Sequence, residues 1–501
     1  MKEADKLVAQ FMDQEDVEIQ LFHDQYSEGQ IAYFEIMGDR KHLYQIDPVN
    51  SKETEIELAH TADALMDQSV TTSTINTAQN LLNSRAIKMG RKRNLSVRIT
   101  KFGDYIYYDL GDSRAVRISE NDYSLIDDVP ILFRGQNRDL NEPQEEPVPF
   151  DLAEIEDLWQ LKGFLNIGDE DQKTLFILHV ASMMIPDIDM PASILHGAYG
   201  SGKSRAMIYT KRLIEPVKKG GELERGKQIK NVDEFEVNAS QTRLLCLDNL
   251  SRVSEEIQDS LSVYVTGGRA TKRKLFTDTG RVQMYLRGIA MLSGLNNVVT
   301  KPDLLNRSLI FNFPSLTEST QIEESELDAT FKNLKPRILG AIYKTISCAI
   351  PVYRELKNVS VMNHCGDWQR WLTAIASVHG ISGDEIRRIL RANKKLQNEQ
   401  AIDESPVAGL VIAFMSGRDS YSGSTSDLYD DLGSQVSELP RNFPRTVNSF
   451  GRKVREVQTD LRNEGLEMDF KRTDSQRQIH ITRISEVKEI PSLPSLPSPH
   501  S

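Results

Sequence analysis

Cysteine is scarce in this chain, with three among 501 residues: Cys246, Cys348 and Cys365. So few thiols exclude a small disulfide-stapled fold, and their spacing matches no metal-binding pattern. We therefore expect reduced cysteines, no zinc site and a cytoplasmic protein.

Long apolar runs are also lacking. No stretch approaches the roughly 20 apolar residues that a membrane-spanning helix needs. The first six residues, MKEADK, do not have the charged-then-apolar layout of a signal peptide. We expect no membrane association.

Positive charge is in deficit, because 61 Lys and Arg face 73 Asp and Glu, for a net charge of −12. This balance excludes a protein coated with DNA-binding surface, but it does not exclude local basic sites. Residues 441–483 carry ten Lys or Arg against six Asp or Glu, so this segment is net positive. Paired carboxylates of the Asp-x-Asp type are absent from residues 97–118, which argues against a primase active site there.

One complete phosphate-binding pattern is present. Residues 197–204, GAYGSGKS, fill every fixed position of G-x-x-x-x-G-K-[ST]. Glycines let backbone N–H groups turn toward phosphates, Lys203 can reach the β and γ oxygens, and the Ser204 hydroxyl can bind Mg²⁺. Residues 192–195 predict a strand before this loop, and residues 205–213 predict a helix after it. We assign ATP to this loop, held by Gly197, Gly200, Ser201, Gly202, Lys203 and Ser204.

A second buried strand is predicted at residues 243–249, RLLCLDN. It ends at Asp248, whose carboxylate can hold Mg²⁺ together with Ser204. The next residue is Asn249, at a place where many ring ATPases have a glutamate that polarises the attacking water. An amide can orient a water but cannot take its proton. The sequence therefore supports ATP binding more strongly than fast hydrolysis.

A third strand, residues 289–292, runs into a polar segment that could sense the γ-phosphate from between the first two strands. Asn296 is the first candidate for this role and Ser293 the second. Arg307 stands just ahead of another strand-like run, residues 308–313. We interpret Arg307 as an arginine finger for the nucleotide of a neighbouring subunit. The alternative is a surface arginine or a local ion pair.

This order of loop, acidic strand, polar strand end and arginine resembles that of AAA+ ATPases, and among them helicase superfamily III and the phage- and mobile-element-type primase-helicases. In that group a basic hairpin between the acidic strand and the sensor strand grips single-stranded DNA in the channel of a hexamer. Residues 266–277, TGGRATKRKLFT, fall at this place. The resemblance thus implies phosphate contacts by Lys272, Arg273 and Lys274; the alternative is a solvated turn.

A closer resemblance is to ATP-binding proteins of phages and integrated mobile elements. It rests on a Tyr-Asp-Leu strand at residues 106–110, a proline-bearing hinge at 128–134 and the LDNLS run at 247–251, and it spans residues 20–485. One departure is that Ser293 stands where we expect Asn at the end of the sensor strand. This departure leaves the sensor assignment open.

The C-terminal region has a distinct pattern. Apolar residues at spacings of three and four predict an amphipathic helix over residues 445–463, and residues 466–470 and 479–481 alternate as two strands. With a helix at 426–436, this pattern indicates a winged helix. Basic residues off its apolar stripe and at its tip could contact duplex DNA, namely Arg452, Arg455 and Lys471; the alternative is a protein-docking domain.

We therefore predict an α/β fold class, an AAA+ P-loop ATPase core with an N-terminal α+β domain, a helical lid and a C-terminal winged helix. Domain size suggests about three domains. The predicted boundaries are 1–140 for the N-terminal domain, 141–152 for a linker, 153–320 for the ATPase core, 321–404 for the lid, 405–485 for the winged helix and 486–501 for a disordered tail.

The sequence predicts an ATP-dependent DNA helicase or translocase that forms a homo-oligomeric ring, a hexamer, in replication of a phage or mobile element. Its cofactors would be ATP and Mg²⁺. Its partners would be single-stranded DNA, duplex DNA through the C-terminal domain, and a separate primase. One alternative is an ATP-controlled DNA-binding or loader protein with slow hydrolysis. Another, a regulatory ATPase of a defence system, should carry an effector domain, and none is visible.

Overall fold

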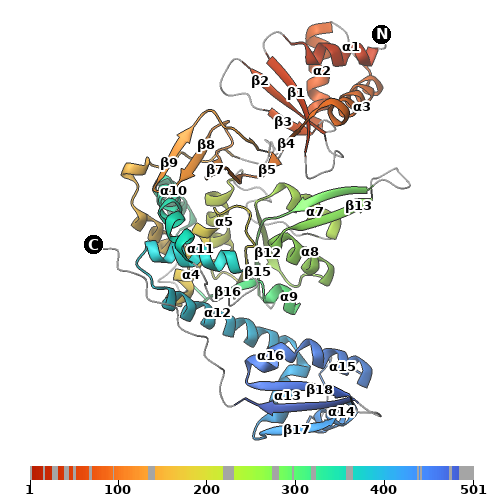
Figure 1. Ribbon diagram of the computed structural model, residues 1–501, viewed down its shortest axis with the longest axis vertical. Coiled ribbons are helices and arrows are strands. Elements are labelled where there is room, and N and C mark those ends of the chain that lie inside the picture. Colours follow the sequence, from red (N-terminus) through yellow and green to blue (C-terminus); the bar gives the residue numbers. More distant parts are fainter. Residues whose placement is uncertain are drawn as a thin grey trace.

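The computed structural model has three parts that follow one another along its long axis, with the N-terminal part at one end and the C-terminal part at the other (Figure 1). The description covers residues 3–14, 17–24, 32–38, 45–48, 52–66, 70–93, 95–133, 142–217, 229, 231–273, 281–295, 298–316, 323–356, 365–436, 439–440, 443–472 and 477–484.

A parallel four-stranded sheet forms the centre of the molecule. Its strands, in spatial order, are β12 (Leu244–Leu250), β15 (Ile289–Gly294), β11 (Ala192–Gly197) and β16 (Ser308–Phe313). Nearly all of their side chains are buried, as expected for parallel strands covered on both faces. The four strands predicted here are confirmed, and the third lies between the first two as expected.

The two faces of this sheet have separate cores. One core joins alternate strand residues to α4 (Glu170–Ser182) and α5 (Lys203–Ile214). The other joins the intervening strand residues to α7 (Val232–Gln241), α8 (Glu255–Thr266) and α9 (Pro302–Leu305). This alternation gives a helix–sheet–helix layering, and the predicted helix after the loop is confirmed as α5.

A two-stranded antiparallel hairpin interrupts the central part between α8 and β15. Its strands are β13 (Gly268–Arg273) and β14 (Arg281–Leu286), paired from Gly268 with Leu286 to Arg273 with Arg281. It extends outward beside α7 (Figure 1). The basic segment singled out in the sequence therefore lies on a hairpin. Lys272 and Arg273 are its last described residues before the tip, and Lys274 lies outside the described part.

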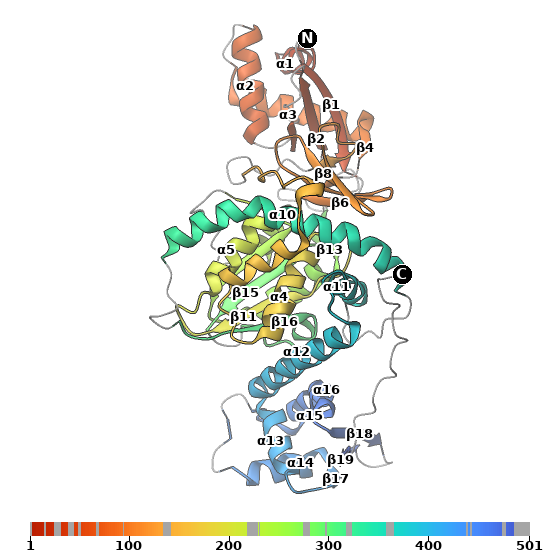
Figure 2. The same cartoon turned by 90° about the vertical axis from the view of Figure 1, so that its left-hand side faces the viewer.

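Helices follow the last central strand, within the segment 321–404 that was predicted to be helical: α10 (Glu324–Glu355), α11 (Gly366–Val378) and α12 (Gly383–Glu404). They pack with the 3-10 helices η1 (Phe150–Leu152) and η2 (Ile155–Phe164). Figure 2 shows α10 running across the top of the central part and α12 leading down from it.

Side chains cover the outer edge of β16, the last strand of the sheet. Asn393 of α12 accepts from the Ile310 N–H (3.2 Å) and donates to the Ile310 carbonyl (2.7 Å). Gln397 of α12 donates to the Ser308 carbonyl, and Gln172 of α4 accepts from the Asn312 N–H at 2.8 Å. The exposed backbone groups of an edge strand are thereby satisfied without another strand.

The N-terminal part has its own sheet, in the order β3-β2-β1-β4, and its own core. Its elements are α1 (Glu3–Met12), β1 (Val17–Asp24), β2 (Ala32–Gly38), β3 (Gln45–Pro48), α2 (Lys52–Met66), α3 (Thr72–Met89) and β4 (Arg91–Arg93). The sequence predicts a strand pair at residues 32–36 and 42–46 and a helix over 71–86, which correspond to β2, β3 and α3. Elements α1, β1 and α2 were not predicted.

Apolar alternation over residues 97–118 predicts a meander of three strands. The structure has four antiparallel strands in this meander: β6 (Ile99–Phe102), β7 (Tyr105–Asp109), β8 (Ala115–Ser119) and β9 (Asp122–Ile126). Short strands flank it, β5 (Leu95–Ser96) and β10 (Leu132–Phe133), which pair in parallel. Its buried face continues the core formed by η2 and α10, where Tyr343 of α10 packs against Tyr108 and Tyr123. We grouped the meander with residues 1–140, but it packs with the central part.

The C-terminal part runs α13 (Pro406–Met415), β17 (Ser420–Ser424), α14 (Thr425–Ser434), α15 (Val447–Glu456), α16 (Gln458–Asn463), β18 (Leu466–Arg472) and β19 (Arg477–Arg483). Its sheet has the order β17-β19-β18 and its core is separate. The helix predicted over 445–463 is divided at Val457 into α15 and α16. The two strands after it are confirmed, whereas α13 and β17 were not predicted.

Candidate phosphate-binding site

The phosphate loop lies between β11 and α5, at the carboxyl ends of the strands, and its glycines are required there. Gly200 and Gly202 have φ of 74° and 89°, a region that side chains with a Cβ rarely adopt. At Gly197, a Cβ atom would lie 2.3 Å from the Phe313 carbonyl oxygen. The backbone therefore takes a curve that only glycine permits at these positions.

Lys203 opens α5 and turns its ammonium group back into this curve. It donates to the carbonyls of Gly197 and Ala198, both at 2.7 Å, and to the Ser201 hydroxyl at 3.2 Å. Burial lowers the pKa of Lys203, and the negative charge of Asp248 opposes that shift. The cation is held where a phosphate cradled by the loop would meet it. The Ser204 side chain, next along the helix, is exposed.

Asp248 lies two residues before the end of the acidic strand β12 and meets the neighbouring strand β15. Its Oδ1 accepts hydrogen bonds from the Ser293 hydroxyl and from the Asn249 N–H, the latter at 2.8 Å. Ser293 is fully buried between β12 and β11. The structure thus brings Lys203, Asp248 and Ser293 together at one end of the sheet. Asn296, our first choice as sensor, lies outside the described residues.

Asn249 follows Asp248 with φ of 55°, in the left-handed region that Asn tolerates better than most residues. Its N–H also approaches the Ser293 hydroxyl oxygen, at 3.3 Å. Its side chain is exposed. An exposed amide at this place can orient a water molecule beside the loop, but it is no general base.

Arg307 lies at the opposite end of the sheet from the loop. Its carbonyl accepts from the N–H of Ala192, the first residue of β11, whereas the loop begins at the last residue of that strand. Strand rise makes this separation about 17–20 Å. The guanidinium group of Arg307 bonds to Asp303, at 3.1 and 3.2 Å. The local ion pair considered in the sequence analysis is therefore present, and Arg307 is not brought to the loop of its own chain.

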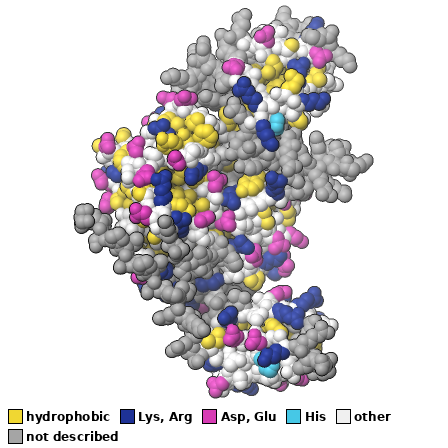
Figure 3. All heavy atoms as spheres, in the orientation of Figure 1, with side chains coloured by type: hydrophobic (Ala, Val, Ile, Leu, Met, Phe, Trp, Pro, Cys, Tyr) yellow, Lys and Arg dark blue, Asp and Glu magenta, His cyan; other side chains and the backbone are white. Residues whose placement is uncertain are grey.

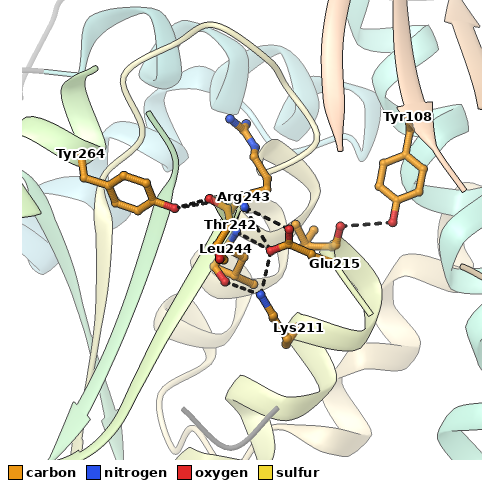
Figure 4. Close-up of polar contacts among 8 residues, drawn as sticks. Tyr108, Lys211, Glu215, Thr242, Arg243, Leu244 and Tyr264 are labelled. Carbon is orange, nitrogen blue, oxygen red and sulfur yellow. Dashed lines mark hydrogen bonds and ion pairs between the residues drawn. The ribbon is translucent and has the colours of Figure 1, made fainter. Parts of the chain in front are cut away.

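A buried polar network, which sequence reasoning missed, fastens the far end of α5 to the start of β12 (Figure 4). Lys211 and Glu215 form an ion pair at 2.7 Å with about 3% of each side chain exposed. Glu215 accepts from the N–H groups of Arg243 and Leu244, and Lys211 donates to the Leu244 carbonyl. The Arg243 guanidinium bonds to the carbonyls of Met183 and Ile185. Burial lowers the pKa of Arg243.

Residues outside that sheet reinforce the same helix end. The Tyr108 hydroxyl of β7 donates to the Ile214 carbonyl at 3.1 Å. Gln144 donates to the carbonyls of Arg212 and Leu213, which are also in the last turn of α5. The last turn of α5 is thus fixed both to the start of β12 and to residues outside the sheet, which fixes the helix that carries Lys203 at its other end.

A cleft of about 400 Å³ opens beside the loop. It is bordered by the start of α4, including Gln172, and by the carboxyl ends of β11 and β16, His196 and Asn312 among them. The Asn166 amide ties the loop to the residue after β16, because it donates to the carbonyls of Ser201 (3.0 Å) and Pro314 (2.7 Å). This cleft could receive the part of a nucleotide beyond its phosphates.

The basic residues singled out in the C-terminal part lie on two neighbouring elements. Arg452 and Arg455 are exposed on α15, and Lys471 is exposed on β18. The Arg455 guanidinium lies 5.2 Å from the ring centre of Phe470, which directly precedes Lys471. Arg455 therefore lies against β18, beside the residue that precedes Lys471.

Within the described part of the chain, no helix is both long and apolar enough to cross a bilayer. The same residues contain no cluster of three or more His, Cys, Asp or Glu suited to a metal ion.

Two protein-family profiles match the chain. Residues 157–357 match the actinomycete integrative conjugative element replication protein family, AICE_RepA, and residues 407–495 match the AICE RepA C-terminal domain. Together the two matches cover more than half of the chain. A search of curated proteins finds no match.

Among solved structures, one described as "SCCmec type IV Cch - active helicase" aligns over 94% of this chain and 93% of its own, with a TM-score of 0.45 and 11% identity. Another, "The A form apo structure of NrS-1 C terminal region-CTR", aligns over 93% and 97%, with a TM-score of 0.40 and 9% identity.

Proposed function

The chain belongs to the RepA replication-protein family of actinomycete integrative conjugative elements, and we propose that within this role it is an ATP-dependent DNA helicase or translocase. The observation that carries the proposal is the meeting of Lys203, Asp248 and Ser293 at one end of a parallel sheet. A strand, a glycine loop and a helix N-terminus here combine into an anion site.

ATP and Mg²⁺ fit the residues of this site. Backbone N–H groups of the loop and the Lys203 ammonium would hold the phosphates, and Ser204 with Asp248 would hold the ion. Bound Mg²⁺ would neutralise charge on the β and γ phosphates. Asn249 would orient the attacking water, and Ser293 would keep the Asp248 carboxylate in place for the ion.

Strand order supports an AAA+ core of superfamily III character. The sensor strand β15 lies between β11 and β12, and the β13–β14 hairpin stands between the acidic strand and the sensor strand. In a ring, this hairpin would carry Lys272, Arg273 and Lys274 toward single-stranded DNA in the channel. Helices α10 to α12 would form the lid.

Arg307 supports assembly into a ring, a hexamer in our proposal. An arginine at the end of the sheet opposite the loop cannot serve its own nucleotide, but it can serve the neighbouring subunit's. There it would stabilise charge developing on the γ-phosphoryl group. Without a neighbouring subunit's nucleotide, the Arg307 guanidinium pairs with Asp303.

The C-terminal part supports a winged helix that contacts duplex DNA. Its order is helix, strand, three helices and two strands, α13 through β19. This is the order of such a domain when α15 and α16, divided at Val457, are taken as one helix. Arg452, Arg455 and Lys471 would contact phosphates.

The test is the rate of ATP hydrolysis with and without single-stranded DNA, with the mass measured by light scattering. A helicase should show DNA-stimulated turnover on the order of 1–10³ s⁻¹, assembly with ATP, and separation of forked duplexes only with hydrolysable ATP. A monomer with no DNA response would refute the proposal.

Asn249 favours a second candidate, an ATP-controlled DNA-binding or loader protein with slow hydrolysis. An amide at this place cannot accept a proton from water. If a non-hydrolysable analogue supports both assembly and DNA binding while turnover stays slow, the loader function replaces the helicase.

A further inference from the structure

Two aromatic side chains stand exposed on the outer face of the β6–β9 sheet. Phe102 and Tyr105 have exposed fractions of 53% and 39%. They are direct partners across the β6–β7 pair, so their rings share one face of the sheet as neighbours. Neither serves the hydrophobic core.

The opposite face of the same strands supplies the core. Ile106, Tyr108, Val116 and Ile118 are at most 5% exposed, and they pack with η2 and α10. The sheet is therefore already anchored through one face. On the other face Tyr107 is buried at 4% exposed, whereas the neighbouring rings of Phe102 and Tyr105 remain accessible to a ligand.

A cation accompanies these rings. The Arg117 guanidinium of β8 lies 5.2 Å from the ring centre of Tyr105 and donates to the Ser124 hydroxyl at 3.3 Å. Tyr107, the cross-strand partner of Arg117, meets Tyr105 edge to face, with ring centres 6.3 Å apart. Hydrophobic and basic side chains are seen together in the region of this sheet in Figure 3.

Carboxylates lie at both ends of this face, because Asp109 ends β7 on the same side as Tyr105 and Tyr107. Asp104 is in the turn between β6 and β7, and Asp122 opens β9, paired with Ser119. Arg117 lies one step further along the strands, away from both turns. A polyanion crossing the sheet would therefore pass over Arg117, between the two acidic ends.

We propose that this face binds single-stranded DNA, with bases stacked on Phe102 and Tyr105 and the backbone beside Arg117. Every unpaired base has a flat ring that can stack on an aromatic side chain, whatever the sequence. A guanidinium group beside the aromatic side chains can contact the phosphates that link the bases. The inference rests on the proposed function only in taking single-stranded DNA as the ligand. It adds a DNA site separate from the hairpin and from the C-terminal part.

Binding of a fluorescein-labelled oligo(dT) to the full chain, without nucleotide, tests the proposal. Phe102→Ala and Tyr105→Ala should each weaken binding about 5- to 100-fold, the range of one lost stacking contact. Tyr105→Phe, which keeps the ring, should bind like the parent. Arg117→Ala should lower the slope of log affinity against log salt by about one unit.

Leu125→Ala is the matched control, because Leu125 is 40% exposed on β9 of the same sheet and its cross-strand partner is the buried Val116. It should leave oligo(dT) affinity unchanged. Equal losses for Leu125→Ala and Tyr105→Ala would mean damage to the sheet and would overturn the stacking site.

Crosslinking provides a readout independent of affinity. Oligonucleotides carrying 5-iodouracil, irradiated on the full chain, should join to a peptide containing Phe102 or Tyr105. Crosslinks found only elsewhere, with unchanged affinity of Tyr105→Ala, overturn the proposal. A change of mass by light scattering in Phe102→Ala and Tyr105→Ala, with DNA binding intact, would instead identify a protein-docking face. ATP turnover in these variants should match that of the unmodified chain. If the unmodified chain itself does not hydrolyse ATP, the proposed function is refuted, but the single-stranded DNA site is not.

Discussion

The Ser293 hydroxyl donates a hydrogen bond to the Asp248 carboxylate across the β15–β12 pair. This contact links the end of the acidic strand to the strand beside the phosphate loop. A carboxylate held in this way has one oxygen oriented by the protein and the other left for a cation.

Ser293→Ala should therefore lower turnover about 10- to 100-fold, as expected when an outer-shell partner of a metal ligand is lost. ATP affinity without Mg²⁺ should stay the same, because the loop and Lys203 are untouched. Steady-state ATPase and nucleotide-binding assays separate these effects. Ser193→Ala is the control, since Ser193 is fully buried on β11 and its hydroxyl has no hydrogen-bond partner among the residues that the structure describes. An equal loss there would contradict a specific role for Ser293.

Lys203→Ala should abolish tight binding of ATP with Mg²⁺. Among the described residues, Lys203 carries the only ammonium group that points into the loop, and the substitution removes it. Asp248→Ala should keep nucleotide binding but stop turnover. Fluorescent-nucleotide binding and phosphate release measure the two steps. Parental hydrolysis by Lys203→Ala would show that the site is misassigned.

Arg307→Ala should keep ATP affinity and lose turnover by about 10³- to 10⁵-fold, the contribution typical of an arginine finger. Mixing it with Lys203→Ala subunits should restore part of the activity, because each mixed interface can combine one intact loop with one intact arginine. If mixtures show no rescue and each variant is inactive alone, Arg307 acts only through its pair with Asp303.

Glu215→Gln should reduce the free energy of unfolding by about 3–5 kcal/mol, since it leaves Lys211 charged and buried without its partner. Urea unfolding followed by circular dichroism measures the change. Glu399→Gln is the matched control: Lys395 and Glu399 form the same i,i+4 pair on α12, but with 76% and 51% of their side chains exposed. The control should change stability by less than about 1 kcal/mol, and a similar loss in both would contradict the buried network.

Arg452→Ala, Arg455→Ala and Lys471→Ala should each weaken duplex binding, and each should lower the salt dependence by about one unit of log-log slope. Titrations of duplex DNA at several salt concentrations measure the slope. Lys453→Ala provides the comparison, because Lys453 is engaged by Glu456 at 2.6 Å. Unchanged slopes in the three variants would make the C-terminal part a protein-docking domain.

Much of the central part could be predicted because its strands are apolar runs that end in recognisable residues. Local pattern did not reveal β9, whose sequence DYSLI is half polar and which forms by pairing with β8. It also could not assign the meander to the central part, since that depends on the contact of Tyr123 with Tyr343.

The candidate site shows the same division. The loop motif identified Lys203 and the end of the second strand identified Asp248, while Asn296 was preferred to Ser293 as sensor. Strand register brings Ser293 to Asp248, because Leu247 pairs with Leu292 and the next residues on the two strands are Asp248 and Ser293. Asn296 lies outside the described residues. Lys211 and Glu215 gave no signal, since a Lys–Glu pair at i,i+4 on a helix is ordinarily solvated.

The covered edge of β16 bears on how copies of this chain can associate. With Asn393, Gln397 and Gln172 on its backbone groups, β16 cannot recruit a strand from another molecule. Contacts at this side must then form between side chains of folded subunits. Such subunits can separate and recombine without unfolding. Exchange of intact subunits between assemblies is therefore permitted on this side, and the rescue experiment with mixed variants depends on it.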